Sequence, residues 1–445
     1  MSHDLTTGPL KRQIHRLALP VIGGSLFHFA FEFIDMIWVG RLGKEALAAI
    51  SASQFVVWIF LAAAGIPAIG LLAVLSRRRG EGNIREARDT AASGIGIGVV
   101  IGIGFTVVTF FFLDPFVGVM GLQGEMHLQA VNYARIILVM APVFFVSFVG
   151  EKIFHAAGDT TTPFRVLAGA ILLNILLDPL LIFGWLGFPR LGISGAAVAT
   201  VLAETLYMVV LLIIMIRRGL FTPQLQALRF RWELFWKVVR IGVPQSLTGV
   251  IFSLVYMVLT NILTGHGPEP IAALGIGHRV EYISWILAMG YSTAAATTVG
   301  QNLGAGNIER VKKGVRYATL TAVVLSGILA LVYFFGAEQC VRIFTSDQSV
   351  LTTGSAYLRI LALSQIFMAM EIVLGGAFSG AGNTMPLMAI SVPLSIARIP
   401  LALFLVRYVT HDVSGVWWAI SISTIVRGLL MSYWWSRGHW QRTNV

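Results

Sequence analysis

Seven acidic side chains of this 445-residue chain stand inside apolar stretches, where a charge is costly to bury. They are Glu32, Asp35, Glu151, Asp178, Glu204, Glu281 and Glu371. An acid in such a place either exchanges a proton, binds a cation, pairs with a basic group or hydrogen-bonds a neighbouring helix. Each of the seven is therefore a candidate for ion or proton chemistry.

Polar residues in the first half are spaced for a shared site. Glu32 and Asp35 are three residues apart, and Asn174 and Asp178 are four apart, so each pair lies on one face of a helix. Pro179 lacks a backbone donor, which leaves a carbonyl of the preceding turn free to accept a proton-bearing group or a cation. We expect these residues to form one polar chamber.

Two chemistries fit this chamber. Two acids that share a site resist ionising together, so one of them can load and release a proton. A Na+ site would instead keep Asp35 and Asp178 ionised, with Asn174 and Thr200 as neutral oxygen ligands. A purely structural role is the third interpretation, and it is disfavoured because polar contacts between helices in lipid seldom need acids.

The second half does not repeat these acids. Its candidates for substrate binding or for pairing are Glu281, Glu371 and Arg398, and we expect Glu371 either to pair with Arg398 or to meet a cationic substrate. Glu32 is a further candidate of this kind in the first half. Glu151 and Glu204 are expected to be structural or to lie near an interface.

Pro20 stands a few residues into the first apolar segment. A proline there removes a helical hydrogen bond, so a bend becomes cheap. It is either a proline that starts the helix or a hinge that bends when Asp35 changes protonation.

Membrane-spanning helices must position these residues. Hydrophobic residues make up 56% of the chain and charged residues only 12%, which excludes a cytosolic enzyme. The apolar residues form continuous runs of about 20, the length of a helix that crosses the bilayer, and not the alternating pattern of a barrel. Twelve spans are predicted, at residues 17–39, 46–75, 90–113, 136–157, 166–186, 193–216, 241–263, 271–299, 317–337, 356–380, 385–405 and 415–435.

Basic residues predict the orientation. With the N-terminus inside, 22 Lys and Arg residues fall on the cytoplasmic side and five on the other, so both termini are expected in the cytoplasm. Because the basic surplus lies in short loops, membrane topology explains it and a nucleic-acid partner is not expected. The single cysteine, Cys340, allows no internal disulfide and no thiolate cluster, and no firm metal site and no cofactor are predicted.

The two halves repeat one another. A shift of 224 residues places Pro20 on Pro244, Gly82-Asn83-Ile84 on Gly306-Asn307-Ile308, and Ala157-Gly158-Asp159-Thr160 on Ala381-Gly382-Asn383-Thr384. Since the period spans six helices, the halves are parallel repeats about an axis along the membrane normal. We expect an N-terminal lobe at 1–216, a cytoplasmic linker at 217–240 and a C-terminal lobe at 241–445.

These motifs together resemble the multidrug and toxic compound extrusion family over nearly the whole chain. The resemblance includes Phe33-Ile34-Asp35, Val39-Gly40-Arg41-Leu42-Gly43 and Gly300-Gln301-Asn302-Leu303-Gly304-Ala305-Gly306. It implies cation-coupled export of amphipathic, often cationic compounds. Within the family the chain is similar to the DinF-type branch, which implies coupling residues at Asp35, Asn174 and Asp178, with Thr200 a weaker match.

The sequence thus favours a twelve-helix, proton-coupled multidrug antiporter of a prokaryotic inner membrane that works by alternating access. Its expected partners are amphipathic drugs and dyes and the lipid bilayer, and it is expected to be a monomer. Three alternatives stay open: Na+ coupling, a flippase for lipid-linked precursors, and a membrane-embedded enzyme. The flippase would need cationic groove residues, and the enzyme would need a catalytic constellation that no motif supplies.

Overall fold

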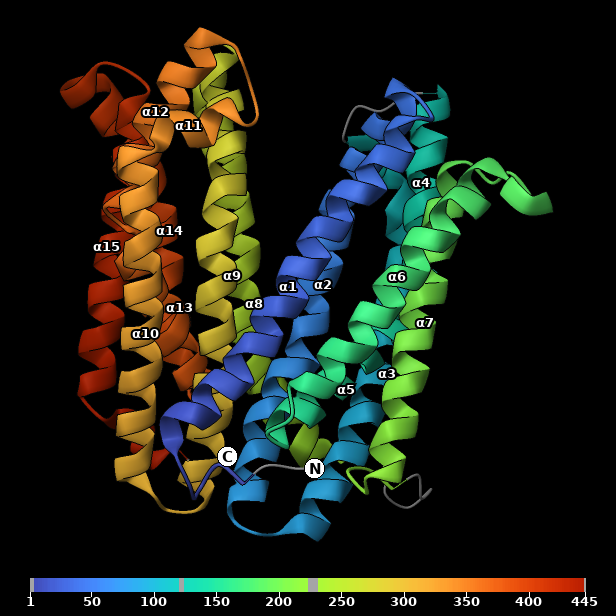
Figure 1. Ribbon diagram of the computed structural model, residues 1–445, viewed down its shortest axis with the longest axis vertical. Coiled ribbons are helices and arrows are strands. Elements are labelled where there is room, and N and C mark those ends of the chain that lie inside the picture. Colours follow the sequence, from blue (N-terminus) through green and yellow to red (C-terminus); the bar gives the residue numbers. More distant parts are fainter. Residues whose placement is uncertain (1–3, 120–123, 223–230, 444–445) are drawn as a thin grey trace. The chain divides into compact units, whose positions relative to one another are not determined.

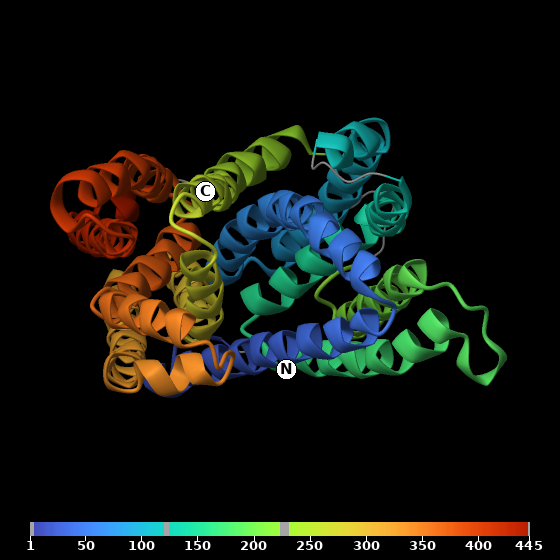
Figure 2. The same ribbon diagram turned by 90° about the horizontal axis from the view of Figure 1, so that it is seen from above.

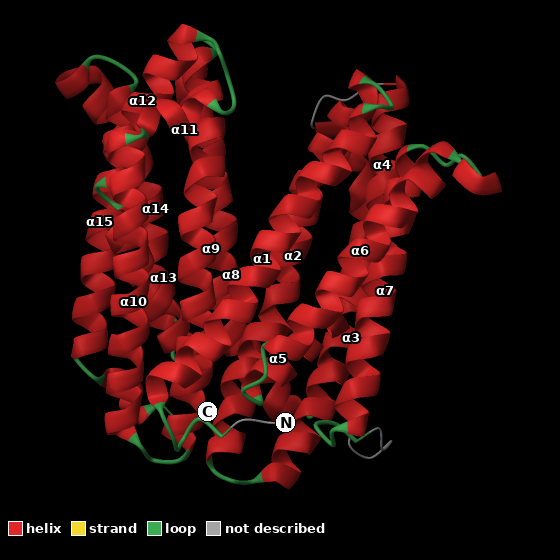
Figure 3. Ribbon diagram, viewed as in Figure 1, coloured by secondary structure: helices red, strands yellow, loops and turns green. Residues whose placement is uncertain are grey.

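The structure is a computed structural model that describes residues 4–119, 124–222 and 231–443. Within these ranges the chain is helical apart from short connections and contains no strand (Figure 3). The predicted all-helical fold class is therefore confirmed.

Helices of the first repeat follow the predicted spans (Figure 1). They are α1 (Leu10–Gly40), α2 (Lys44–Gly80), α3 (Ile84–Val119), α4 (Gly124–Val139), α5 (Ala141–Ala156), α6 (Thr161–Phe183) and α7 (Ile193–Arg217). A 3-10 turn at Trp185–Gly187 follows α6.

The second repeat has the same order. It comprises α8 (Trp232–Thr264), α9 (Glu269–Gly304), α10 (Ile308–Phe335), the short α11 (Ala337–Arg342), α12 (Gln348–Ala362), α13 (Gln365–Gly380), α14 (Met385–Leu405) and α15 (Ser414–Ser436), with short turns at Val406–Thr410 and His439–Arg442. The first residues of α3, α4, α5 and α6 are 84, 124, 141 and 161, and those of α10, α12, α13 and α14 are 308, 348, 365 and 385, a constant difference of 224. The sequence repeat is therefore also a repeat of helices.

Two of the predicted spans are bent helix pairs. The axes of α4 and α5 differ by 51° and those of α12 and α13 by 56°, at breaks that occupy the same place in the two repeats. Among the described residues nine helices are long and apolar enough to cross a membrane, or up to eleven when each bent pair is one span. The predicted span 271–299 is helical as part of α9. Because α9 contains many polar residues, it is not one of these nine helices.

The described chain divides into two compact units that do not coincide with the predicted lobes. The first unit contains the described residues of Gly23–Gly242, and the second contains those of Leu5–Ile22 and Val243–Val445. The beginning of α1 therefore belongs to the second unit, and the beginning of α8, together with the described part of the predicted linker 217–240, belongs to the first. Residues 223–230 of that linker lie outside the described residues. Seen from above, the helices of each unit can be followed in Figure 2.

Close contacts of two glycines explain why the start of α1 belongs to the second unit and the start of α8 to the first. In the first unit a Cβ on Gly242 of α8 would lie 2.0 Å from the carbonyl oxygen of Ile66 in α2. At the equivalent place in the second unit, a Cβ on Gly290 of α9 would lie 2.9 Å from the carbonyl oxygen of Ala18 in α1. Only glycine allows the backbones to approach this closely, so each helix beginning is held by the unit it enters.

The paired Ala-Gly-Asp-Thr and Ala-Gly-Asn-Thr turns have a common geometry. Gly158 and Gly382 have φ values of 75° and 74°, the left-handed conformation that ends a helix. The next residues, Asp159 and Asn383, donate their backbone N–H to Phe154 and Phe378. Each glycine therefore ends the helix before it, α5 or α13, and lets α6 or α14 begin two residues after the polar side chain.

Each unit has its own apolar core. Phe60, Phe145 and Tyr133 are buried in the first. In the second, Leu259 and Ala402 are completely buried, together with Tyr357 and Trp417. Leu259 and Ala402 are the repeat equivalents of Asp35 and Asp178. The second unit therefore has apolar core residues at the two positions where the first unit has acids.

Candidate functional site

The centre of the first unit's polar cluster is Asp178 on α6. Its side chain is completely buried, and Asn174, one turn earlier on the same helix, is only 3% exposed. Both carboxylate oxygens of Asp178 and the amide oxygen of Asn174 lack a hydrogen-bond partner among the described residues. Buried polar atoms are normally satisfied, so these three oxygens are the atoms most ready to receive a proton or a cation.

The cluster also contains Asp35 and Thr200. Asp35, on α1, lies close enough to Asp178 for their negative charges to repel each other. Thr200, on α7, accepts a long hydrogen bond of 3.4 Å from the amide of Asn174 and donates one of 3.0 Å to the carbonyl of Ala196. The structure therefore places Asp35, Asn174 and Asp178, three of the residues predicted to share a polar chamber, in one cluster, with Thr200 beside Asn174.

Tyr133 joins this cluster and was missed in the sequence. It lies on α4, is 7% exposed, and is close enough to Asp35 and Asp178 to feel both charges. A signal was present: a shift of 224 places Tyr133 on Tyr357, so this aromatic position is kept in both repeats although the acids are not.

The donor set fits either a proton or an alkali cation. Carboxylates, an amide oxygen and a hydroxyl are the hard oxygen ligands that such cations prefer. No group of three or more His, Cys, Asp or Glu side chains that could hold a metal ion occurs among the described residues. A cation here would therefore depend on Asn174 and Thr200 in addition to the two acids.

Glu32 was predicted to share the polar chamber, but the structure places it outside this cluster. Its side chain is 52% exposed and faces His28, one turn earlier on α1, at 3.6 Å. It is close enough to Asp35 for their charges to interact, but it is not enclosed with it.

In the second unit, Glu371 does not form an ion pair with Arg398. Its Oε1 instead lies 3.1 Å from a guanidinium nitrogen of Arg427 on α15 and accepts a 2.8 Å hydrogen bond from Ser391. The pairing of Glu371 with Arg398 suggested by the sequence is thus corrected. Arg427 is not among the residues predicted from the sequence, although its position inside the apolar segment 415–435 is a signal for a polar role.

Arg398 is held by neutral groups. It is completely buried, its Nε donates to Ser423 at 2.8 Å, and its guanidinium lies 5.3 Å from the centre of the Tyr256 ring. One of its terminal nitrogens has no hydrogen-bond partner among the described residues. Arg398 is the repeat equivalent of Asn174, so the same place carries an amide in one unit and a cation in the other.

Glu281 of α9 accepts a 3.2 Å hydrogen bond from the completely buried amide of Gln365 and lies near enough to Arg398 and Arg427 to interact with their charges. The second unit therefore combines two acids with two arginines.

Glu151 and Glu204 lie in a separate polar group of the first unit. Glu151 on α5 is 2.5 Å from the amine of Lys152 and 3.7 Å from His155. Glu204 on α7 is near enough to interact with the charge of Glu151. Because Glu151 already has basic partners, its contacts favour a structural role over a coupling role.

Comparison with known proteins identifies the family to which the chain belongs. A family model described as MatE matches the chain twice, at residues 20–180 and 244–404, two ranges that are 224 residues apart. The chain belongs to the MatE family. Members of this family are transporters and not enzymes, so the chain is a membrane transporter.

Two relatives of this MatE protein extend over nearly its whole length. It is 29% identical over 438 residues to the probable multidrug resistance protein NorM of Thermotoga maritima, which covers 98% of this chain and 94% of that protein. It is 28% identical over 439 residues to a FAD transporter of Shewanella oneidensis, which covers 97% and 95%. A solved outward-facing structure of a multidrug resistance MATE transporter has a TM-score of 0.91 at 24% identity, with 99% of both chains covered. This structural similarity shows that the chain and the solved transporter have the same fold.

Proposed function

We propose that this MatE transporter is a proton-coupled multidrug antiporter that exports amphipathic, often cationic compounds by alternating access. The observation that carries the proposal is the cluster of Asp35 and Asp178, in which both carboxylate oxygens of Asp178 are buried without a hydrogen-bond partner and neither acid has a basic ion-pair partner among the described residues. The multidrug names of its relatives support the substrate class.

Proton exchange follows from this electrostatic arrangement. When both acids are ionised they repel, and one proton shared between them relieves the repulsion. We assign the main proton-carrying role to Asp35 and the role of its partners to Asp178 and Asn174, with Thr200 orienting the amide. A state with the proton bound and a state with drug bound would then alternate, because the two ligands favour different conformations.

Na+ coupling is the closest variant. It would use the same atoms, with both acids ionised and the oxygens of Asn174 and Thr200 completing the ligand set. The unpartnered amide oxygen of Asn174 supports this variant specifically, since proton exchange does not require it.

The Pro20 hinge belongs to this mechanism. α1 passes from the second unit to the first between Ile22 and Gly23, two residues after Pro20. A bend at Pro20 would change the direction of the later part of α1, and therefore the position of Asp35 relative to the start of that helix. We propose that Pro20 allows this change and that Pro20→Ala reduces transport or alters its pH dependence.

A second candidate substrate class is an anionic nucleotide-like compound. Arg398 is completely buried, has one guanidinium nitrogen without a partner, and has no carboxylate within ion-pair distance among the described residues. One relative is named a FAD transporter. Arg427, in contrast, is neutralised by Glu371, so the cationic groove required by a flippase for lipid-linked pyrophosphates is not supported.

The decisive experiment is efflux from everted vesicles with one gradient imposed at a time. A pH gradient should drive ethidium transport by the wild type and not by Asp35→Asn, whereas a Na+ gradient alone should be ineffective. If a Na+ gradient drives transport equally well, Na+ takes the place of the proton as the coupling ion. Efflux of FAD but not ethidium, lost in Arg398→Gln, would favour the anionic substrate.

Orientation is tested separately. Both termini are proposed to be cytoplasmic in the inner membrane, so a reporter fused to either end should be active only as a cytoplasmic reporter.

A further inference from the structure

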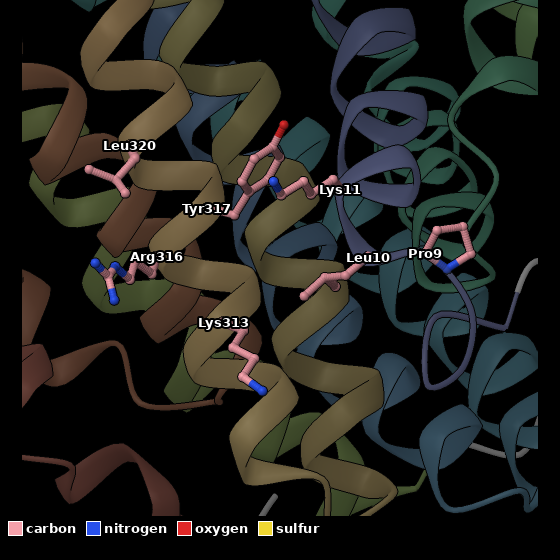
Figure 4. Close-up of a pocket in the computed structure, with 7 residues that line it drawn as sticks. All are labelled: Pro9, Leu10, Lys11, Lys313, Arg316, Tyr317 and Leu320. Carbon is pink, nitrogen blue, oxygen red and sulfur yellow. The ribbon is translucent and has the colours of Figure 1, made fainter.

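A groove in the second unit lies between the beginning of α1 and the basic part of α10. It has a volume of about 550 Å³ and is lined by Pro9, Leu10, Lys11, Lys313, Arg316, Tyr317 and Leu320 (Figure 4). The α10 residues are spaced 313, 316, 317 and 320, the pattern that places them on one face of a helix. The groove therefore presents two cations from α10 and one from α1 to the same space.

These cations are not neutralised by the protein. No ion pair to an acid is found for Lys11, Lys313 or Arg316 among the described residues, and all three side chains are exposed. By contrast, the neighbouring Lys312 points to Glu309 at 3.3 Å. A site with three unpaired cations attracts an anion and disfavours the cationic compounds assigned to the transport path.

The rest of the lining is apolar or amphipathic. Leu320 is 52% exposed and lies one turn beyond Arg316, towards the apolar part of α10. The amine of Lys11 lies 5.4 Å from the centre of the Tyr317 ring. Charge at one end and exposed leucine at the other match a molecule with an anionic headgroup and hydrocarbon chains better than they match a free anion.

The wall formed by residues 9–11 is fixed by a network that begins with Leu5. The backbone N–H of Leu5 donates to Gln301 at 3.0 Å, and its carbonyl accepts from Asn302 at 3.2 Å and from Arg310 at 2.9 Å. Leu5 is only 1% exposed. Gln301 and Asn302 belong to the glycine-rich motif at 300–306, so this motif anchors the N-terminal segment to the second unit.

Arg310 continues the network towards the groove. It donates to the carbonyls of Thr7 and Gly8 at 2.8 and 2.9 Å and to the side chain of Gln13 at 2.8 Å. Residues on both sides of Pro9–Lys11 are thus held against α10. The groove is therefore formed by a fixed part of the chain.

We propose that this groove binds the headgroup of an anionic phospholipid of the cytoplasmic leaflet, with Lys11, Lys313 and Arg316 contacting the phosphate and Leu10 and Leu320 contacting the glycerol and upper acyl chain. The cytoplasmic placement rests on the proposed orientation. Basic pockets beside membrane helices on that side recognise such headgroups through the same combination of charge and apolar surface.

Native mass spectrometry of the purified full chain in detergent tests the proposal with phosphatidylglycerol as the probe. One lipid should bind to the wild type, and phosphatidylcholine of the same chain length should bind far less. Lys313→Gln/Arg316→Gln should lose roughly 30-fold in affinity, the weakening expected from removing two cations at a membrane surface. The matched control, Arg12→Gln/Lys312→Gln, also removes two cations next to the groove residues and should bind as the wild type does.

Three results would overturn the proposal. They are equal binding by the groove variant and the control, equal binding of phosphatidylcholine, and displacement of the lipid by inorganic phosphate at the same concentration, which would assign the site to a free anion. Transport by the groove variant in vesicles without anionic lipid should equal that of the wild type in the same vesicles. This comparison keeps a failure of the lipid proposal distinct from a failure of the proposed coupling function.

Discussion

Asp178 of α6 and Ala402 of α14 occupy the same place in the two repeats, and both are completely buried. In the second unit this place is filled by a methyl group inside the apolar core, with Leu259 at the place of Asp35. The fold therefore does not need acids at either position. Burying Asp178 in the first unit is therefore a cost that the fold does not require, and this supports the proposed ion coupling.

Asp35→Asn should abolish drug export while the protein remains folded in the membrane. The amide keeps the shape of the side chain but can neither bind nor release a proton. Ethidium efflux measures the activity, and fluorescence-detected size exclusion measures folding. Glu32→Gln is the matched control, because Glu32 lies one turn earlier on α1 and is half exposed; it should retain most of the transport. Normal export by Asp35→Asn would refute the assignment.

Asp178→Ala should also abolish coupled transport, and it should not lower the thermal unfolding midpoint. The variant reproduces the second unit's alanine and removes two buried carboxylate oxygens without partners, a burden of about 1–3 kcal/mol. Thermal unfolding in detergent, followed by tryptophan fluorescence, checks the prediction. A marked loss of stability would show that Asp178 has a structural role.

The ion pair of Glu371 with Arg427 should be strongly coupled. Glu371→Gln leaves a buried guanidinium without its carboxylate and should reduce the free energy of unfolding by about 3–5 kcal/mol. The double variant Glu371→Gln/Arg427→Gln should lose less than the sum of the single losses. A parallel cycle of Glu371 with Arg398 is the control and should show weak coupling; the opposite order of the two cycles would restore the pairing expected from the sequence.

Asp159, in the turn before α6, should make stability depend on pH. Burial by itself raises the pKa of this carboxyl, but hydrogen bonds from Thr162 and Arg218 outweigh burial and lower the pKa below its ordinary value. Its contribution to stability is therefore complete above the unfolded pKa of about 4 and is lost as the pH falls through the lower, folded pKa.

Asp159→Asn is the variant that tests this dependence. It should lower stability at pH 7 by about 1–3 kcal/mol, and the difference from the wild type should shrink on acidification below about pH 4. The second repeat already has Asn383 at this place, so the turn itself tolerates the amide. Unfolding curves measured between pH 7 and pH 3 provide the check, and a difference that grows at low pH would contradict the assignment.

Arg310→Gln should release the N-terminal segment. The variant loses the guanidinium hydrogen bonds to Leu5, Thr7, Gly8 and Gln13, so limited proteolysis near the N-terminus should accelerate by at least about tenfold. Lys312→Gln removes a nearby cation that takes no part in the network and serves as control. Equal cleavage rates for the two variants would show that the segment is held by other contacts.

Much of the fold follows from the sequence because lipid leaves the backbone few choices. Apolar runs long enough to span a bilayer must be helices, and a register of 224 residues that persists through polar turns must reflect a duplicated helical unit. Asn174 and Asp178 could be placed on one face because they belong to a single helix. The sequence also predicts that Asp35 lies near them, because acidic side chains inside the bilayer usually face a common polar site or a partner.

Only the tertiary structure decided which residues from distant helices meet. Arg427 and Arg398 both stand in apolar segments, and nothing local tells which one faces Glu371; the packing of α13 against α15 decides it. The assignment of Leu5–Ile22 to the second unit likewise depends on the close approach of α1 to Gly290, far along the chain. Sequence periodicity fixes the faces of one helix, whereas partners between helices depend on crossing geometry and side-chain packing, which no local pattern encodes.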